Sequence, residues 1–256
     1  MIRRRTASTW NALGRTNAFG AVLTREGRLA AWDAAEFFET GRADAARFVA
    51  DMDRLVSSAS RARALDFGCG VGRVTRALAD HFDEVVGVDA APSMIERARQ
   101  LDVGNRCSFV LNETHDLAQF ASGMFTVVYS RLVLQHIRPA LVRRYIPELV
   151  RVLVPGGVLM FQLPEVVGVD PARGIGRLPL VGHLKRRVPW SAVVIWRRLK
   201  CRLSATSEAA QMTMFGMAQD EVLALVAGAG GRVLDVRADE SHGDARIRGS
   251  EYWVTR

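Results

Sequence analysis

The chain of 256 residues is long enough to bury a substantial core within one α/β domain with additions, so no second core is required. Its net charge of +8 is unevenly distributed, because nine of the 35 Lys and Arg residues fall within residues 172–202, which contain no Asp or Glu. The rest of the chain is near neutral, which argues against a broad basic surface for nucleic acid.

The cysteines and the apolar runs bear on the cellular compartment. Cys69, Cys107 and Cys201 have no paired spacing, which fits a reducing interior rather than a disulfide scaffold. The basic start of the chain is not followed by an apolar signal core, and no run approaches the ~18 residues of a membrane span. We therefore expect a soluble, cytoplasmic protein, and the sequence does not indicate its oligomeric state.

Residues 1–60 precede the first predicted strand and have helical character. The clearest predicted helix is Asp44–Val56, where Phe48, Met52 and Leu55 recur three or four positions apart. We expect this N-terminal helical extension to pack on the sheet, and the alternative is a direct contact with substrate.

The stretch 63–79 combines an apolar strand, a glycine-rich loop and a helix start. Gly68, Gly70 and Gly72 allow tight-turn dihedral angles and leave no Cβ atoms between the backbone and a ligand. A helix predicted to begin at Val71 would offer free N–H groups to an anionic group. The pattern therefore predicts a cradle for a nucleotide or a carboxylate, although a glycine-rich loop alone is weak evidence.

A second predicted strand, Val85–Asp89, supplies the context for that loop. Its terminal acid follows Gly72 by 17 residues, and an acid at this tip holds ribose hydroxyls in dinucleotide-type folds. A nicotinamide enzyme would have glycine at position 73, where this chain has Arg73. The sequence therefore disfavours a nicotinamide oxidoreductase.

The rest of the chain alternates between predicted strands and helices, which indicates a parallel sheet with right-handed crossovers. A helix at 94–101 has Ser93 as its expected cap, and no helix separates the last two strands, so the final strand is expected to run antiparallel. The remaining predicted strands are 106–111, 124–129, 157–163, 232–236 and 251–255, and the remaining predicted helices are 140–152 and 217–229.

Four segments, in this order and spacing, resemble the motifs of Rossmann-like (class I) S-adenosylmethionine-dependent methyltransferases: Leu65–Gly72, Val86–Asp89, Phe125–Ser130 and Leu149–Gly157. The resemblance covers roughly residues 60–165 and the last forty. It implies a Rossmann-like α/β domain over residues 61–256 with a seven-stranded, mostly parallel sheet and an antiparallel last strand. Residues 1–60 would form an extension or cap, and residues 170–204 an insert.

The resemblance also implies S-adenosyl-L-methionine as cofactor and a set of contacts to it. Asp66 and the Gly68–Gly72 backbone would hold the methionine part, Asp89 both ribose hydroxyls, and Asp116 with Leu117 the adenine. The alternative for Asp116 is an ordinary loop acid or helix cap. The full implied cofactor-binding set is Asp66, Gly68, Cys69, Gly70, Gly72, Asp89, Ala90, Met94, Asp116, Leu117 and Ser130.

One position departs from the family. Thr126 stands where these methyltransferases usually carry Asp at the start of the fourth strand. The departure puts fine positioning in doubt more than activity, and it keeps a non-catalytic S-adenosylmethionine-binding module as an alternative.

The chemistry of methyl transfer points to a catalytic base. Transfer from a sulfonium is an in-line displacement with donor and acceptor roughly 3–3.5 Å apart and water excluded. A base assists when the acceptor is a hydroxyl, and histidine titrates near neutral pH. We predict His136 as this base because it follows the fourth strand, at the carboxyl edge where such folds bind ligands. The alternative is a structural histidine at the head of the next helix.

Other polar residues at the same predicted edge are candidates for substrate binding. Gln162 and Glu165 finish the fifth strand and suit hydrogen bonds to a polyol, while Arg131 could clamp an acidic substrate group or form a capping ion pair. The loop with Asp239, Glu240 and His242 could bind a divalent metal such as Mg²⁺ that orients a sugar diol, and His242 could contact the substrate. A solvated turn is the favoured alternative for this loop.

The basic segment 172–202 also carries many apolar residues, including Trp190 and Trp196. We expect a substrate cap or lid, with peripheral contact to an anionic membrane as the alternative. The predicted function is methyl transfer to a small or medium polar acceptor, most simply a hydroxyl of a sugar, glycan or secondary metabolite. The alternative within the class is N- or C-methylation of a lipid-like or quinone substrate.

Overall fold

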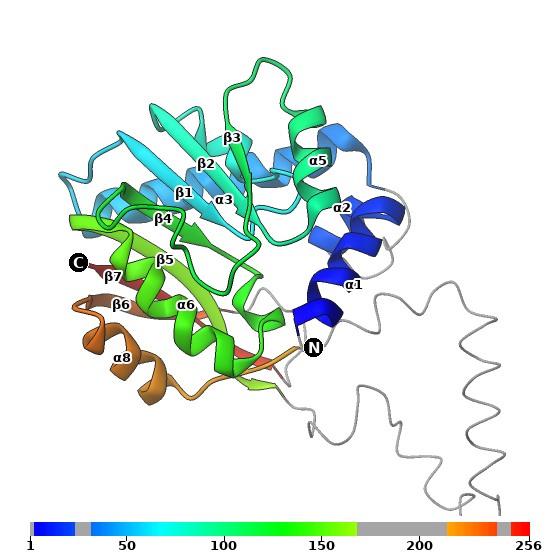
Figure 1. Ribbon diagram of the computed structural model, residues 1–256. Coiled ribbons are helices and arrows are strands. Elements are labelled where there is room, and N and C mark those ends of the chain that lie inside the picture. Colours follow the sequence, from blue (N-terminus) through cyan, green and yellow to red (C-terminus); the bar gives the residue numbers. More distant parts are fainter. Residues whose placement is uncertain (1–2, 24–31, 168–213, 240–246) are drawn as a thin grey trace, which may run out of the picture. The chain divides into compact units, whose positions relative to one another are not determined.

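Seven strands form one sheet in the order β3-β2-β1-β4-β5-β7-β6 (Figure 1). The computed structural model describes residues 3–23, 32–167, 214–239 and 247–256. The strands are β1 (Arg63–Phe67), β2 (Glu84–Asp89), β3 (Ser108–Leu111), β4 (Phe125–Ser130), β5 (Leu153–Val167), β6 (Arg232–Asp239) and β7 (Ile247–Thr255).

The direction of the strands confirms the expected fold class. β1 pairs in parallel with β2 and β4, β2 with β3, and β4 with β5. β7 runs antiparallel to both of its neighbours, β5 and β6. Strand order reverses between β1 and β4, and such a switch point is where open α/β sheets bind ligands, beyond the carboxyl ends of the strands.

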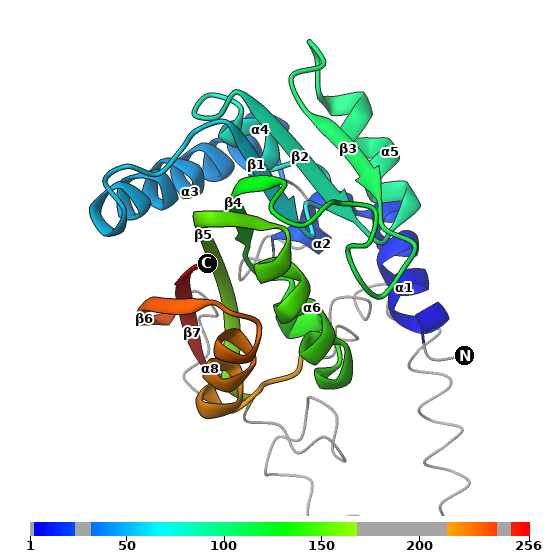
Figure 2. The same ribbon diagram turned by 60° about the vertical axis from the view of Figure 1, so that its left-hand side comes forward.

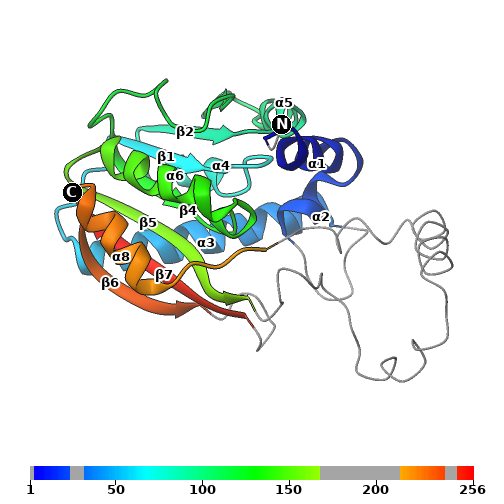
Figure 3. The ribbon, with the colours of Figure 1, turned by 60° about the horizontal axis from the view of Figure 1, so that its bottom comes forward.

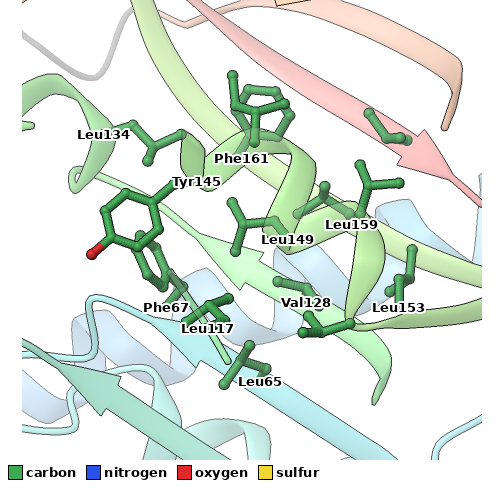
Figure 4. Packing of buried hydrophobic residues seen from close by; sticks show 14 of the residues in the cluster. Leu65, Phe67, Leu117, Val128, Leu134, Tyr145, Leu149, Leu153, Leu159 and Phe161 are labelled. Carbon is green, nitrogen blue, oxygen red and sulfur yellow. The ribbon is translucent and has the colours of Figure 1, made fainter. Parts of the chain in front are cut away.

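Helices cover both faces of the sheet (Figure 3). The α3 side is packed with Phe48, Met52 and Trp253, and the α6 and α8 side with Tyr145 and Leu149 among others (Figure 4). The helices are α1 (Arg3–Thr16), α2 (Ala18–Val22), α3 (Ala34–Leu55), α4 (Thr75–Leu78), α5 (Pro92–Leu101), the 3₁₀ turn η1 (Leu134–His136), α6 (Pro139–Arg151) and α8 (Gln219–Gly228).

The N-terminal helices begin at places that the periodicity did not reveal. α3 starts ten residues before Asp44, because the Asp33 carboxylate caps it by accepting a hydrogen bond from the Glu36 N–H at 3.1 Å. α1 lies beside α5 (Figure 2), where the Asn11 side-chain oxygen accepts from the Ser93 N–H at 2.9 Å. The expected Ser93 cap was therefore wrong, since Ala91 is the cap residue of α5 and Ser93 binds α1.

The helix after the glycine loop is also shorter than expected. Turns continue through residue 74, and α4 comprises only Thr75–Leu78. The expected helix start at Val71 was therefore wrong by four residues, and the backbone between the last glycine and α4 forms turns. Across the described residues, no helix has the length and apolar character needed to cross a membrane. Residues 172–202 lie outside the described residues, so the lid and membrane readings stay predictions.

Candidate functional site

The glycine loop follows β1 and turns as its sequence predicts. Gly68, Gly70 and Gly72 have φ angles of +80°, +53° and +81°, which side chains rarely adopt. A Cβ added at Gly68 would lie 2.4 Å from the Val133 side chain, and one added at Gly70 would lie 2.7 Å from that of Val22. The loop is thus held closely between α2 and the segment that follows β4.

Asp89, at the tip of β2, holds the glycine loop from the other side. Its carboxylate accepts hydrogen bonds from the Gly70 N–H at 3.0 Å and the Ala91 N–H at 2.8 Å. Burial raises the pKa of Asp89, and these backbone donors oppose the shift. A carboxylate offers about four lone-pair sites, so two such bonds leave acceptor capacity for a vicinal diol.

Asp66 lies on the α3 side of β1 and is buried. The Thr75 hydroxyl donates to its carboxylate at 2.6 Å. Burial raises the pKa of Asp66 to about 6, while the Thr75 hydrogen bond and the charge of Arg73 act in the opposite direction. The carboxyl therefore changes between its neutral and ionised forms near pH 6.

The segment after β4 is fixed by polar contacts. The Ser130 hydroxyl donates to the Phe67 carbonyl at 3.1 Å, which joins the ends of β4 and β1. Leu132 has a φ of +61°, and its N–H donates to the Gln162 side-chain oxygen at 3.2 Å. Gln162 is fully buried and also donates to the Gln135 side chain at 3.3 Å. The structure thus uses Gln162 to shape this segment.

His136 ends η1 at the carboxyl edge of the sheet, as its position in the sequence predicts. The imidazole is half-buried, and its Nε2 lies 3.1 Å from the Gln135 side-chain nitrogen. The Trp10 ring of α1 meets the imidazole edge-on, with ring centroids 5.1 Å apart. The N-terminal extension therefore forms one wall around the predicted base, and Trp10 carried no signal of this role in the sequence.

Arg131 forms an ion pair within the chain. Its guanidinium lies 2.7 Å from the Asp44 carboxylate of α3 and 3.9 Å from that of Asp239. Asp44 also binds Arg73, directly after the glycine loop, at 2.7 Å. Of the two roles expected for Arg131, the ion pair is the one that these contacts match. Asp44 was a residue that sequence reasoning placed only at a helix start.

The remaining predicted cofactor residues surround the tips of β2 and β3. Ala90 is exposed, while Cys69 and Met94 are buried. The Leu117 side chain lies in the core, and its N–H donates to Glu148 at 2.8 Å. Hydrogen bonds from Thr114 and from the Ala118 N–H lower the pKa of Asp116.

The described candidate residues for substrate and metal binding make other contacts within the chain. Glu165 accepts a hydrogen bond from the Ser250 hydroxyl at 3.0 Å, and Asp239 lies near Arg131. Glu240 and His242 fall outside the described residues. Within the part of the chain that the structure describes, no group of three or more His, Cys, Asp or Glu residues could hold a metal ion. Thr126 binds the Arg63 backbone at the start of β1, at the opposite edge from the glycine loop.

Part of the chain matches a known family and several known proteins in sequence. Residues 65–161 match the family described as "Methyltransferase domain". The chain is 31% identical over 140 residues to a trans-aconitate 2-methyltransferase of Methylobacterium nodulans, covering 54% of this chain and 51% of that protein. It is 37% identical over 103 residues to phosphoethanolamine N-methyltransferase 3 of Arabidopsis thaliana, covering 38% of this chain and 20% of that protein. The matches thus span about half, or less, of these relatives' lengths.

Solved structures share the fold. Magnesium protoporphyrin IX methyltransferase from Synechocystis, with bound SAH, superposes with a TM-score of 0.59 at 15% identity, covering 98% of this chain and 99% of that one. A SAM-dependent methyltransferase from Leishmania major superposes with a TM-score of 0.63 at 13% identity, covering 99% of this chain and 82% of that one. At such low identity these likenesses describe the fold alone.

Proposed function

We propose that this protein transfers a methyl group from S-adenosylmethionine to a small or medium polar acceptor, because residues 65–161 match the methyltransferase-domain family. When bound, this cofactor supplies an electrophilic methyl group on a sulfonium. The observation that carries the proposal is the pairing of the Asp89 carboxylate with the Gly70 N–H at the switch point of the sheet.

The residues around that pair suit the cofactor. Asp89 retains acceptor capacity for the ribose diol, and the tightly turned backbone of Gly68–Gly72 would lie beside the methionine part. Asp66, with a pKa of about 6, would accept the methionine ammonium in its ionised form. Ala90, Met94, Asp116, Leu117, Ser130 and Cys69 complete the proposed cofactor set.

The cofactor assignment can be tested by binding measurements that do not require the acceptor. Titration with S-adenosylhomocysteine and with NADH, by calorimetry, is expected to give binding of the thioether only. The Asp89→Asn variant should weaken that binding by about 1.5–3 kcal/mol, the usual contribution of a hydrogen bond to a charged group. Asp80→Asn, at an exposed ion pair with Arg106, is the matched control. Tight NADH binding without thioether binding would end the proposal.

The proposed acceptor is a hydroxyl of a sugar, glycan or secondary metabolite, with His136 as the base. The half-buried imidazole at the carboxyl edge supports this role. The named relatives favour a second candidate, methylation of a carboxylate or an amine, because one is a trans-aconitate 2-methyltransferase and another a phosphoethanolamine N-methyltransferase. Methylation of a lipid-like or quinone acceptor is the further alternative, and residues 172–202 are proposed as the cap over the acceptor.

Replacement of His136 distinguishes a base from a structural histidine. With a hydroxyl acceptor found by screening, His136→Ala should reduce turnover by about 10²–10⁴-fold, the usual contribution of general-base catalysis. Its affinity for S-adenosylhomocysteine should stay unchanged, as should both properties of the His81→Ala control. Undiminished turnover would refute the base role, and a carboxylate acceptor would need no base.

A further inference from the structure

We propose that Asp44 is a positioning residue that couples the glycine loop to the segment carrying His136. This inference rests on the proposed function, because it concerns how that site is held in shape. Asp44 lies on α3, outside every motif discussed above, and its carboxylate is shared between two arginines from different parts of the chain.

Asp44 contacts one arginine in each of the two segments that form the proposed site, the end of the glycine loop and the segment after β4. Its Oδ2 atom lies 2.7 Å from Nη2 of Arg73, the residue that follows the last glycine of the loop. Its Oδ1 atom lies 2.7 Å from Nη1 of Arg131, the residue that follows β4. These partners are 29 and 87 positions from Asp44 along the chain, so α3 acts as a brace across the two segments.

Because these ion pairs are largely buried, the loss of one partner should cost more free energy than at the surface. The side chains of Arg73, Arg131 and Asp44 are only 5%, 12% and 20% exposed. Among the described residues, the Nε atoms of both arginines are buried without a hydrogen-bond partner. Removal of one member of a buried pair leaves an uncompensated charge, which is strongly unfavourable. Replacing Asp44 would therefore disturb both segments at once.

Close packing prevents α3 from shifting independently of the loop. A Cβ added at Gly41 would lie 2.1 Å from the Arg73 carbonyl oxygen, so the helix directly abuts the loop backbone. The Arg73 guanidinium also donates to the Thr40 hydroxyl at 3.0 Å, one turn before Asp44. Arg73 is thus fixed to α3 at its backbone and its side chain.

The segment after β4 connects Arg131, which Asp44 holds, to His136 five residues later. Arg131 is followed by Leu132, whose left-handed φ of +61° is held by the hydrogen bond to Gln162, and by Val133, which packs against Gly68. A non-glycine residue in this region is strained and persists only where its surroundings hold it. The Arg131–Asp44 pair is one of these fixing contacts, so a change at the glycine loop and a change near His136 would be linked through Asp44.

The same helix provides a matched control. Asp51 lies seven residues after Asp44 on α3, is also buried, and its Oδ1 atom likewise binds two arginines, Arg54 and Arg237. Neither partner belongs to the glycine loop or to the segment after β4. The Arg54 and Arg237 side chains are 73% and 32% exposed, so Asp51→Asn removes two ion pairs of a buried carboxylate on the same helix without touching the site.

The experiment measures S-adenosylhomocysteine affinity by calorimetry and thermal stability by circular dichroism. Both Asp44→Asn and Asp51→Asn should lower the melting temperature. Only Asp44→Asn should weaken binding, by about tenfold, within the usual range of coupling between two sites. Asp51→Asn should stay within twofold of the wild type. Asp44→Glu, which keeps the charge, should recover part of the affinity.

A double-mutant cycle tests the shared carboxylate and keeps the inference testable if Asp44→Asn does not fold. Arg131→Gln alone should weaken binding, and its combination with Asp44→Asn should weaken binding by less than the product of the two single effects, because both changes break the Arg131–Asp44 pair. If Asp44→Asn cannot be purified, the cycle is run with Asp44→Glu, which keeps the charge but displaces the carboxylate by one methylene group.

The outcomes separate this inference from the proposed function. A wild type that fails to bind S-adenosylhomocysteine ends the proposed function. Binding by the wild type that is weakened equally in Asp44→Asn and Asp51→Asn, or in neither, overturns the coupling role and leaves the proposed function standing. Additive effects of Asp44→Asn and Arg131→Gln would overturn it as well.

Discussion

At the scale of single residues, Asp66 carries the most informative chemistry. It is a buried carboxyl with one hydroxyl donor, and burial raises its pKa from 3.8 to about 6. The folded state therefore binds a proton more tightly than the unfolded chain. The resulting stability is present below about pH 4 and is lost as pH rises through 6, because ionised Asp66 must then remain buried.

Asp66→Asn should remove this dependence. Asn keeps an oxygen that can accept from Thr75 but has no charge to bury. The variant should have a higher free energy of unfolding above pH 6, by on the order of 2–3 kcal/mol, since each pKa unit corresponds to about 1.4 kcal/mol. Urea unfolding between pH 4 and 8 measures it. Parallel profiles for the variant and the wild type would contradict the assignment.

The same substitution should have the opposite effect on binding. If ionised Asp66 accepts the methionine ammonium, wild-type affinity for S-adenosylhomocysteine should rise as pH increases through about 6. Asp66→Asn should bind more weakly with no such rise. A substitution that stabilises the protein but weakens ligand binding would indicate that the charged residue serves function at a cost in stability.

At the scale of elements, the contact between α3 and the glycine loop is the one most sensitive to a single methyl group. Ala normally stabilises a helix interior by about 1 kcal/mol over Gly. At Gly41 that gain should be reversed, because the added Cβ would lie 2.1 Å from a backbone oxygen, and overpacking costs about 1–3 kcal/mol. Chemical denaturation of Gly41→Ala should show a net loss of stability.

Gly228, near the end of α8, is the control for this prediction. A Cβ added there would meet nothing within 4 Å, and its φ is not left-handed. Gly228→Ala should leave stability unchanged or raise it slightly. If Gly41→Ala were as stable as Gly228→Ala, the close approach of α3 to the glycine loop would be wrong.

The elements also separate what the sequence could predict from what it could not. Most strands and the glycine turns follow from local signals, namely short apolar runs bounded by Gly, Pro or acids. The Asp44 pairs and the Asn11–Ser93 contact join residues at least 29 positions apart, and nothing local encodes them. The helix after the loop was overestimated because apolar spacing persists through residues 71–74, although the backbone there forms turns.

At the scale of the whole molecule, described residues on the two sides of 168–213 lie close together. The Met217 N–H donates to the Pro164 carbonyl at 2.9 Å, and a Cβ added at Gly216 would lie 2.8 Å from the Glu165 carbonyl oxygen. The two junctions are therefore close, and the domain does not need this segment to span a gap between them.

Excision of residues 168–213 should accordingly be tolerated. With a flexible Gly-Ser linker of about six residues in its place, the chain should keep its far-UV circular dichroism and bind S-adenosylhomocysteine within about twofold of the full chain. Loss of methyl transfer with retained binding would support the proposed cap. Loss of folding would contradict the independence of the domain from this segment.

The antiparallel strand β7 has a consequence for the newly made chain. β7 lies between β5 and β6, and in the described sheet β6 pairs with no other strand. Until residues 247–255 leave the ribosome, β5 has an open edge and β6 has nowhere to pair. Open edges of this kind recruit other chains. A nascent polypeptide that lacks residues 247–255 would therefore expose a strand edge that favours aggregation, even where β1–β5 are already paired.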